Sequence, residues 1–418
     1  MMSEACNSAI VIGGGIAGCS SAYALAQRGW QVTLIEREPQ LALGASGNPL
    51  GVLYARLTGS QTILNDLALS SFKHSVNLLQ NLQLSKDDYQ ACGVLQLSFN
   101  ARELERHESL IDKNRENDDS QNITQYLNQA EASEIAGIAL NFGGLYMKSA
   151  GWVNPRVYCH ALANHPNIKI LYSSNAIVLN QQHNQWRVTD AQQVVAEATI
   201  VIIANALDAK QLSQTQHLPL IAVRGQITLM PSNDMSSTLK PLKTVVCADS
   251  HISPAINGTH HLGTTFSPND NTANIRMEDH MKNLSALCKI SAEMNTVVIN
   301  TAPKNIEFLN MLKGRVGWRC QTPDYLPLAG PLMDAQQLSK QPPRYNADVA
   351  SLPWLTGLYV NAGHGSKGLI TAPYCAKLIA EHITHQPLSE PKNMLNALNP
   401  NRFLLREMGL KQLAKIIR

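Results

Sequence analysis

The first forty residues contain a strand, a glycine-rich turn, a helix and a second strand in direct succession. Residues 9–12 read AIVI, residues 13–18 read GGGIAG, and a helical stretch follows as far as Gly29. The next apolar run, WQVTLI at 30–35, ends at Glu36, 18 residues beyond Gly18. An acid at this distance from such a turn predicts a βαβ unit that binds a dinucleotide.

Each part of this pattern has a physical role. Gly13 permits the tight turn, Gly15 lets the backbone approach a pyrophosphate, and Gly18 allows the helix to pack closely. The helix N-terminus offers amide groups to the phosphates, and Glu36 accepts from ribose hydroxyls. The expected cofactor contacts in this unit are Gly13, Gly14, Gly15, Ile16, Ala17, Gly18, Glu36 and Arg37. Because NAD and FAD share the unit, it leaves the cofactor open.

A second glycine-rich segment indicates a flavin. Residues 41–57 read LALGASGNPLGVLYARL, and GASGN followed by Gly51 resembles the loop that FAD-dependent amine oxidases lay against the pyrophosphate and flavin. The alternative is a surface loop. The run ATIVIIANALD at 198–208 has the form of the late strand whose turn passes the FAD, although alone it is only a buried strand. The expected contacts are Ala45, Ser46, Gly47, Asn48, Gly51, Ile177, Ala204, Asn205 and Ala206.

A strand-to-helix turn near the C-terminus is rich in small residues. Residues 358–370 read LYVNAGHGSKGLI and continue into a helical stretch, so a second helix N-terminus is expected to point inward. Its amides would stabilise negative charge on the N1/C2=O edge of a reduced flavin. Lys367 adds a positive charge there or faces solvent, and His364 is a packed turn residue rather than a catalyst. The expected contacts are Gly363, His364, Gly365, Ser366, Lys367, Gly368 and Leu369.

Composition excludes several classes of protein. The 418 residues, 44% of them hydrophobic, suit two or three domains of about 150 residues each. There is no long apolar run and no secretory signal pattern, so we expect a cytoplasmic protein. Eight cysteines without a CxxC or a Cys/His cluster predict neither a metal site nor a disulfide framework. The net charge of +3 permits an anionic partner but is far from a strongly basic footprint.

With these motifs the chain resembles the superfamily of D-amino-acid oxidase, glycine oxidase and sarcosine oxidase over nearly its full length. It is most similar to the FAD-dependent oxidoreductase domain of the MnmC family, the bifunctional tRNA 5-methylaminomethyl-2-thiouridine biosynthesis proteins. The closer likeness lies in RGWQVTLIEREPQLALGASGNPLGVLYARL at 28–57, GRVGWRCQTPDYLPLAGPL at 314–332 and NALNPNRFLLREMGLKQLAKIIR at 396–418. The methyltransferase half of that family is missing, so we expect a stand-alone oxidoreductase or one piece of a larger product.

The resemblance implies an α/β fold: a Rossmann-like FAD-binding domain of the D-amino-acid oxidase type, with an inserted α+β substrate domain on a mainly antiparallel sheet. We expect the FAD-binding domain at 1–88, 148–220 and 313–386, and the substrate domain at 89–147 and 221–312. A basic tail helix is expected at 387–418. The charged helical region 100–119 and the short-strand region 222–301 differ from the Rossmann parts around them.

The resemblance also implies a reaction. Relatives of this type oxidise 5-carboxymethylaminomethyl-(2-thio)uridine at the tRNA wobble position to 5-aminomethyl-(2-thio)uridine and glyoxylate. The flavin takes a hydride from the glycine-like α-carbon, and a bidentate guanidinium suits the carboxylate. In relatives that oxidise glycine-like amines an arginine precedes a T-x-D element, so Arg319 of RCQTPD is the catalytic candidate. The alternative is a structural arginine paired with Asp324 or another acid.

Arg224 and Cys320 also bear on this chemistry. Arg224 in VRGQI is the next candidate for the clamp, although a structural role at a strand edge suits it better. Some relatives link FAD through a cysteine in this C-terminal region, but the spacing of Cys320 to the T-x-D element differs from theirs. Non-covalent FAD is therefore expected.

The expected partner is tRNA, through the wobble uridine of its anticodon loop, with a methyltransferase domain or protein as a further partner. Residues 402–418 carry five basic side chains against one acid, interleaved with apolar residues, which predicts an amphipathic helix. That helix contacts phosphate, receives the methyltransferase, or packs on the body with a solvated basic face. Trp152 and Tyr146 either stack on a base or lie in the core.

Two other functions fit the same motifs. An FAD oxidase of free glycine, sarcosine or D-amino acids would share every flavin motif and the Arg319 clamp, so that only the tRNA-facing surface separates the two activities. A flavoprotein that has lost catalysis and serves a partner is the third interpretation, and purification without FAD would favour it.

Overall fold

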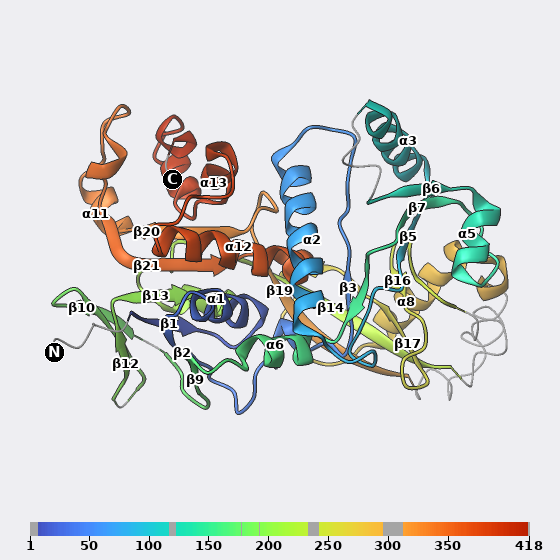
Figure 1. The fold of residues 1–418 in the computed structure, drawn as a ribbon, viewed down its shortest axis with the longest axis horizontal. Coiled ribbons are helices and arrows are strands. Elements are labelled where there is room, and N and C mark those ends of the chain that lie inside the picture. Colours follow the sequence, from blue (N-terminus) through green and yellow to red (C-terminus); the bar gives the residue numbers. More distant parts are fainter. Residues whose placement is uncertain are drawn as a thin grey trace.

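A six-stranded sheet with the order β20-β21-β13-β1-β2-β9 forms the centre of one lobe of the computed structural model (Figure 1). The structure describes residues 7–116, 123–176, 178–191, 193–232, 242–295 and 312–416. Neighbouring strands are parallel except β20, which runs antiparallel to β21. The strands are β1 (Ser8–Ile12), β2 (Gln31–Ile35), β9 (Ile168–Leu171), β13 (Ile200–Ile203), β20 (Leu328–Met333) and β21 (Trp354–Ala362).

The apolar runs predicted from the sequence are strands of this sheet. They are apolar along most of their length because the sheet is covered on both faces. Ala9 and Val11 of β1 pack toward the helices, whereas Ile10 and Ile12 pack toward a second, three-stranded sheet. The helices on the first face are α1 (Ile16–Ala26), α6 (Pro155–Ala163) and α12 (Gly368–Ile383), with α2 (Ile63–Leu82) against α12. The three-stranded sheet consists of β10 (Val178–Gln182), β11 (Gln185–Thr189) and β12 (Val194–Ala198).

The second lobe is built on a nine-stranded, mainly antiparallel sheet, as expected (Figure 1). Its order is β18-β14-β17-β16-β15-β5-β7-β6, with β19 paired to β14, and among these strands only β15 and β5 pair in parallel. The strands are β5 (Val94–Leu97), β6 (Gln125–Leu127), β7 (Gly144–Met147), β14 (Ile221–Pro231), β15 (Val245–Cys247), β16 (His251–Ile252), β17 (Thr259–Gly263), β18 (Ser267–Pro268) and β19 (Lys313–Gln321). The helices of this lobe are α3 (Ala101–Glu116), α5 (Gln129–Ala136) and α8 (Met277–Ile290).

A small sheet of β3 (Gly51–Leu53), β8 (Gly151–Val153) and β4 (Tyr89–Gln90) completes the core, in the order β3-β8-β4. Trp152 lies in β8 and is only 1% exposed, so it is a core residue and not a platform for a base. Tyr146 of β7 packs on Gly93, where an added Cβ would lie 2.4 Å from the ring. The stacking alternative is therefore wrong for Trp152, whereas Tyr146 is only partly buried and its stacking on a base stays a prediction.

The expected domain boundary at residue 313 differs from the structure. Residues 313–321 were expected in the FAD-binding part, but they form β19, which pairs with β14 from Ile221 opposite Gln321 to Leu229 opposite Lys313. The sheet that a strand joins depends on the register of a partner distant in sequence, and no local pattern specifies it.

The C-terminal region is not the single tail helix that was expected. It forms α13 (Lys392–Leu398), α14 (Arg402–Glu407) and the short 3-10 turn η5 (Leu413–Lys415). Gly409 has φ +78°, a left-handed conformation that ends a helix, so the chain turns back there. Leu405 and Leu413 then pack with Met333 in a separate core cluster beside α11 (Ala335–Lys340).

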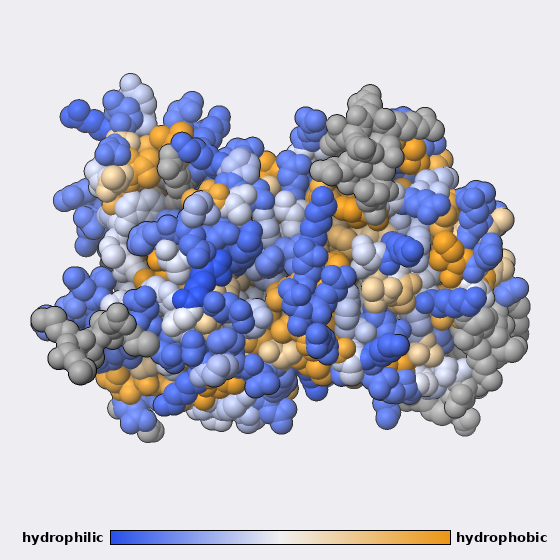
Figure 2. All heavy atoms as spheres, viewed as in Figure 1, coloured by the Kyte–Doolittle hydropathy of each residue, from blue (hydrophilic) through white to orange (hydrophobic). Residues whose placement is uncertain are grey.

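Hydrophilic residues cover most of the face in Figure 2, and the hydrophobic ones form small separate groups. In the part of the chain that the structure describes, no helix is long and apolar enough to cross a membrane. The same residues contain no group of three or more His, Cys, Asp or Glu side chains placed to hold a metal ion.

Candidate active site

The carboxyl ends of four neighbouring parallel strands carry the predicted cofactor contacts. The turn Gly13–Gly18 follows β1, Glu36 follows β2, Ala204–Ala206 follow β13, and Gly363–Gly368 follow β21. In open parallel sheets, ligands bind outside this edge. Of the predicted contacts, Ile177 lies outside the described residues.

The glycine turn has no room for side chains. Gly13 adopts φ +108°, and a Cβ there would lie 2.7 Å from the Cα of Asn205. A Cβ on Gly18 would lie 1.7 Å from the carbonyl oxygen of Gly13, so α1 approaches β1 more closely than any other residue would allow. The turns after β1 and β13 are thus in direct contact.

The first turn of α1 presents unused donors. Gly15 caps the helix without a side-chain hydrogen bond, and Ile16 donates its amide to the Ser46 hydroxyl at 3.0 Å. Within the described residues, the amides of Ala17 and Gly18 have no protein acceptor. Amides at the positive end of a helix dipole are the donors that a pyrophosphate requires.

Glu36 is held beside this turn. Its Oε2 accepts from the Gly14 amide at 2.6 Å and its Oε1 from the Glu38 amide at 2.9 Å. Arg37 is half-exposed and forms an ion pair with Asp208, 2.7 Å away in the turn after β13. The acid expected to bind a ribose therefore lies at the edge of the glycine turn, and Arg37 ties the ends of β2 and β13 together.

Two arginines missed by the sequence reasoning hold the GASGN loop, which contains the 3-10 turn η1 (Ala45–Gly47). Arg315 donates to Asn48 Oδ1 at 2.9 Å and to the carbonyl oxygens of Leu43 at 2.8 Å and Gly44 at 2.5 Å. Arg156 donates to the Gly47 carbonyl at 3.0 Å. Burial lowers the pKa of Arg315, and the charge of Arg156 lowers it further. The signal in the sequence was the spacing of Arg315 and Arg319, which places both on one face of a strand.

Unsatisfied buried atoms in two turns show that this edge suits a polar ligand. Asn205 Oδ1, after β13, and His364 Nε2, after β21, have no hydrogen-bond partner in the described part of the chain. The other ring nitrogen of His364 lies 3.0 Å from the Thr371 hydroxyl, and burial lowers the histidine pKa to about 3, so the ring is neutral. Together with the free amides of α1, these atoms fit the phosphates and the flavin of FAD.

Lys367 is half-buried and lines a narrow hollow. Tyr325 and His364 also line this hollow, together with Leu64 and Leu67 of α2. Burial lowers the pKa of Lys367, and the charge of Arg56 lowers it further. No carboxylate pairs with this ammonium among the residues that the structure describes. An anionic group bound nearby would therefore be stabilised.

Arg319 faces the flavin loops. Arg315, Gly317 and Arg319 share one face of β19; Arg315 contacts the GASGN loop and an added Cβ on Gly317 would lie 4.0 Å from Ala45. Two residues further on, Gln321 forms a β-bridge with His364. The strand thus connects the substrate sheet to two of the turns that surround the cofactor edge.

The guanidinium of Arg319 is half-buried and has no counter-charge among the described residues. It donates to the Thr265 carbonyl at 3.2 Å and to the Thr264 hydroxyl, and burial lowers its pKa. Within the described ranges it has no carboxylate partner. The alternative pairing with Asp324 is wrong, because Asp324 binds Arg402 in a bidentate contact at 2.8 and 3.0 Å.

Arg224 occupies the opposite face of the same sheet. Its side chain is fully buried, forms an ion pair with Asp279 of α8 at 2.6 Å, and donates to the carbonyls of Thr272 and Asn274. Every donor has a protein acceptor, so Arg224 stabilises the fold, in line with the structural role that suited it better from the sequence.

Neutral imidazoles lie near Arg319. Burial lowers the pKa of His251 to about 4, and the charges of His261 and Arg319 contribute. Burial also lowers the pKa of His261 to about 4. At neutral pH, Arg319 therefore supplies the positive charge in this part of the site.

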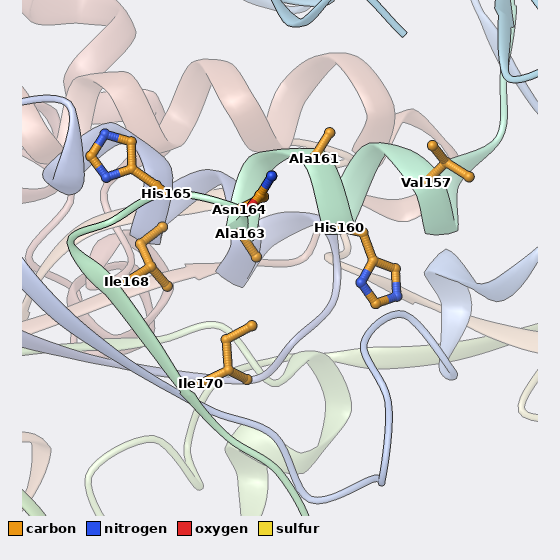
Figure 3. Close-up of a pocket in the computed structure, with 8 residues that line it drawn as sticks. All are labelled: Val157, His160, Ala161, Ala163, Asn164, His165, Ile168 and Ile170. Atoms are coloured by element: carbon orange, nitrogen blue, oxygen red, sulfur yellow. The ribbon is translucent and has the colours of Figure 1, made fainter. Parts of the chain in front are cut away.

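A larger open hollow lies elsewhere, between α6 and β9 at the outer edge of the six-stranded sheet (Figure 3). It is lined by Val157, His160, Ala161, Ala163, Asn164, His165, Ile168 and Ile170. None of the predicted site residues is among them, so size alone does not mark the active site here.

A parallel sheet with a glycine turn and helix N-termini at one edge, joined to a lobe built on a mainly antiparallel sheet, is the arrangement of two-lobed flavoprotein oxidoreductases. The chain belongs to the FAD dependent oxidoreductase family DAO, whose model matches residues 8–382. The expected fold class, the FAD cofactor and the oxidoreductase activity are thereby confirmed.

Similar proteins extend this result. The chain is 46% identical over 408 residues to the tRNA 5-methylaminomethyl-2-thiouridine biosynthesis bifunctional protein MnmC of Methylobacillus flagellatus, covering 97% of this chain and 61% of that protein. The protein of that name from Chromobacterium violaceum is 40% identical over 413 residues, again 97% of this chain and 61% of the relative. The chain thus spans about three fifths of the length of these relatives.

Solved structures share the fold at low identity. Glycine oxidase from Geobacillus kaustophilus has a TM-score of 0.71 at 19% identity, covering 94% of this chain and 98% of that one. L-proline dehydrogenase from P. horikoshii has a TM-score of 0.69 at 19% identity, covering 97% and 98%.

Proposed function

We propose that this chain removes the carboxymethyl group from 5-carboxymethylaminomethyl-(2-thio)uridine at the wobble position of tRNA, giving 5-aminomethyl-(2-thio)uridine and glyoxylate. The observation that carries the proposal is Arg319, a half-buried guanidinium on the same face of β19 as Arg315, which holds the GASGN loop, and without a carboxylate partner in the described part of the chain. Its natural complement is an anionic substrate group. The names of the relatives at 40–46% identity support the tRNA substrate.

The residues divide the work as follows. Bound FAD supplies the two-electron acceptor for the hydride of the substrate's α-carbon. Arg319 holds the substrate carboxylate and so orients that carbon. The neutral histidines near the clamp add no positive charge, so Arg319 is the cation that meets the carboxylate. Water then hydrolyses the imine to release glyoxylate.

The cofactor contacts are part of the proposal. The glycine turn and α1 hold the pyrophosphate, Glu36 the ribose, and the turns Ala204–Ala206 and Gly363–Leu369 the flavin. Lys367 adds positive charge beside them. Burial raises the pKa of Cys320 to about 12, so that thiol stays protonated, which supports non-covalent FAD.

The proposed partners are tRNA and a methyltransferase, fused or separate, in the cytoplasm. The proposed domains keep the expected division except that residues 313–321 join the substrate domain. Arg402 is buried in its pair with Asp324 and cannot contact a phosphate. The side chain of Arg406 is 48% exposed and is a candidate contact for a tRNA phosphate.

A second activity has one specific observation in its favour. The same Arg319 guanidinium would hold the carboxylate of free glycine, sarcosine or a D-amino acid equally well, because it recognises only that group. Such an oxidase would need nothing beyond the clamp and the flavin.

The test is anaerobic bleaching of the FAD-loaded protein by tRNA carrying the carboxymethylaminomethyl group, by unmodified tRNA, and by glycine or sarcosine. We expect rapid bleaching and glyoxylate with the modified tRNA, no bleaching with unmodified tRNA, and only slow bleaching with glycine or sarcosine. Arg319→Ala should keep FAD and lose about 100-fold or more in kcat/KM, the effect of two charge-assisted hydrogen bonds. Arg187→Ala, a surface arginine paired with Glu197, serves as the control. Bleaching only by free amines would overturn the tRNA proposal.

A further inference from the structure

An exposed aromatic ring lies beside the candidate clamp. Phe266 is 55% exposed, and the Arg319 guanidinium lies over its ring, 5.8 Å from the centroid. Other exposed aromatic residues, such as Tyr126 and Tyr345, belong to parts of the chain away from Arg319. An apolar ring of this size is favoured in the interior, where burying it fully would gain about 1.5–3 kcal/mol. Its exposure at this place therefore calls for a functional explanation.

The backbone on both sides of Phe266 is anchored. Thr265, only 8% exposed, donates its amide to the Gln226 carbonyl at 3.2 Å and accepts from the Gln226 amide at 3.0 Å. On the other side, Ser267 and Pro268 form β18, which pairs with β14. The ring is thus presented to solvent by a fixed backbone, which lowers the entropy lost when a ligand stacks on it.

The clamp and the ring are connected through the same loop. Arg319 donates to the Thr264 hydroxyl and the Thr265 carbonyl, directly before Phe266. A group that binds the guanidinium therefore arrives next to the ring. One ring face is turned toward Arg319, and the exposed remainder is available to a second planar group.

The dimensions suit the proposed substrate. Its carboxyl carbon is separated from the pyrimidine by a CH2–NH–CH2 link, about 5 Å when extended, from four bonds near 1.5 Å. The guanidinium carbon and the ring centroid are 5.8 Å apart, so the two side chains are close enough for one substrate to contact both. A free amino acid has the carboxylate but no planar group to place on the ring.

We propose that Phe266 is a specificity residue on which the substrate's pyrimidine stacks while its carboxylate binds Arg319, so that a nucleobase-bearing amine is selected over a free amino acid. This inference rests on the proposed function, because it assumes a modified uridine as substrate. Stacking on an aromatic side chain contributes about 1–3 kcal/mol per base, equivalent to about 5-fold to 150-fold in affinity.

The test compares two probes on the FAD-loaded protein: the nucleoside 5-carboxymethylaminomethyluridine, which has the base but no phosphates, and sarcosine, which has only the carboxylated amine. Phe266→Ala should raise KM for the nucleoside by 5-fold to 150-fold and leave the constants for sarcosine within about 2-fold. Phe266→Tyr should restore the wild-type values, and Phe266→Leu, which keeps apolar bulk without a π-face, should not. Tyr345→Ala, at a 73% exposed ring in the C-terminal region, is the matched control.

The outcomes separate the two proposals. If the wild type is reduced by neither the nucleoside nor modified tRNA, the proposed function fails and this inference with it. If the wild type accepts the nucleoside but Phe266→Ala or Phe266→Leu binds it equally well, only the stacking role is refuted. Equal losses for both probes would also overturn it, because the ring would then act by supporting Arg319. The Tyr and Leu variants decide the question should Phe266→Ala fail to retain FAD.

Discussion

Arg402 of α14 binds the loop that contains Asp324 and Leu326, which lies beside the turn after β21. Its guanidinium is fully buried and binds Asp324 through Nε and Nη2, at 3.0 and 2.8 Å. It also donates to the carbonyls of Leu326 at 2.8 Å and Pro327 at 3.2 Å. The same loop contains Tyr325, which lines the hollow with His364 and Lys367. Loss of Arg402 should therefore loosen the loop as well as the C-terminal cluster.

The expected cost of Arg402→Met follows from these contacts. Removing one partner of a buried ion pair costs about 3–5 kcal/mol, because the other charge and the carbonyls lose their donors. Unfolding entropy near 2.1 cal/mol/K per residue amounts to about 0.9 kcal/mol/K for 418 residues. The melting temperature should fall by about 3–6 °C.

Arg406 on the same helix is a matched control for this experiment. It approaches the same carboxylate, but at 3.7 Å and with 48% of its side chain exposed. Such pairs contribute less than about 1 kcal/mol, so Arg406→Met should shift the melting temperature by about 1 °C or less. The assay is thermal unfolding of the FAD-loaded protein, by flavin fluorescence and calorimetry at one scan rate. Equal shifts for both variants, or none for Arg402→Met, would refute the reasoning.

Four further outcomes are expected. Burial raises the pKa of Asp324, but the pairing with Arg402 outweighs burial and holds the pKa below its usual range. The ionised carboxylate therefore stabilises the folded state fully above about pH 4, and this contribution is lost as the pH falls through the native pKa. The melting temperature of Asp324→Asn should accordingly depend less on acid pH than that of the wild type. Burial lowers the pKa of His364 to about 3, so acidification below about pH 6.5 favours unfolding, and His364→Gln should reduce the loss of melting temperature between pH 6.5 and 4. Gly18→Ala should purify without flavin, judged by absorbance, while Gly44→Ala, whose Cβ would meet nothing within 4 Å, should keep it. Arg315→Ala should weaken FAD binding in equilibrium dialysis by about 10-fold, the effect of one or two hydrogen bonds from a charged donor; unchanged binding would exclude a supporting role for this arginine.

The lobe with the six-stranded sheet could be predicted from the sequence because its motifs lie in short, continuous stretches of the chain. The run AIVI, the glycines and Glu36 lie within one βαβ unit, and each glycine is required by a contact inside that unit or with the adjacent turn. The structure has the expected strands β1, β2, β13 and β21 in one sheet.

The substrate half was only partly predictable. Arg319 could be selected from its motif, but no local pattern showed that Asp324 pairs instead with Arg402, which comes from the far end of the chain. Arg315 was missed because residues 313–321 were expected in the other domain. The tail helix was expected from the alternation of basic and apolar residues, yet Gly409 breaks it and Leu405 and Leu413 are buried.

The sequence alone determined the parallel sheet, the FAD edge and the oxidoreductase family, because short-range periodicity and steric demands on glycine are written into consecutive residues. Only the tertiary structure decided which arginine pairs with a carboxylate and which has no such partner among the described residues, and which aromatic ring is buried and which is exposed. Those outcomes depend on strand register and on contacts between residues far apart in the chain, so that Trp152 ends in the core while Phe266 stands beside Arg319.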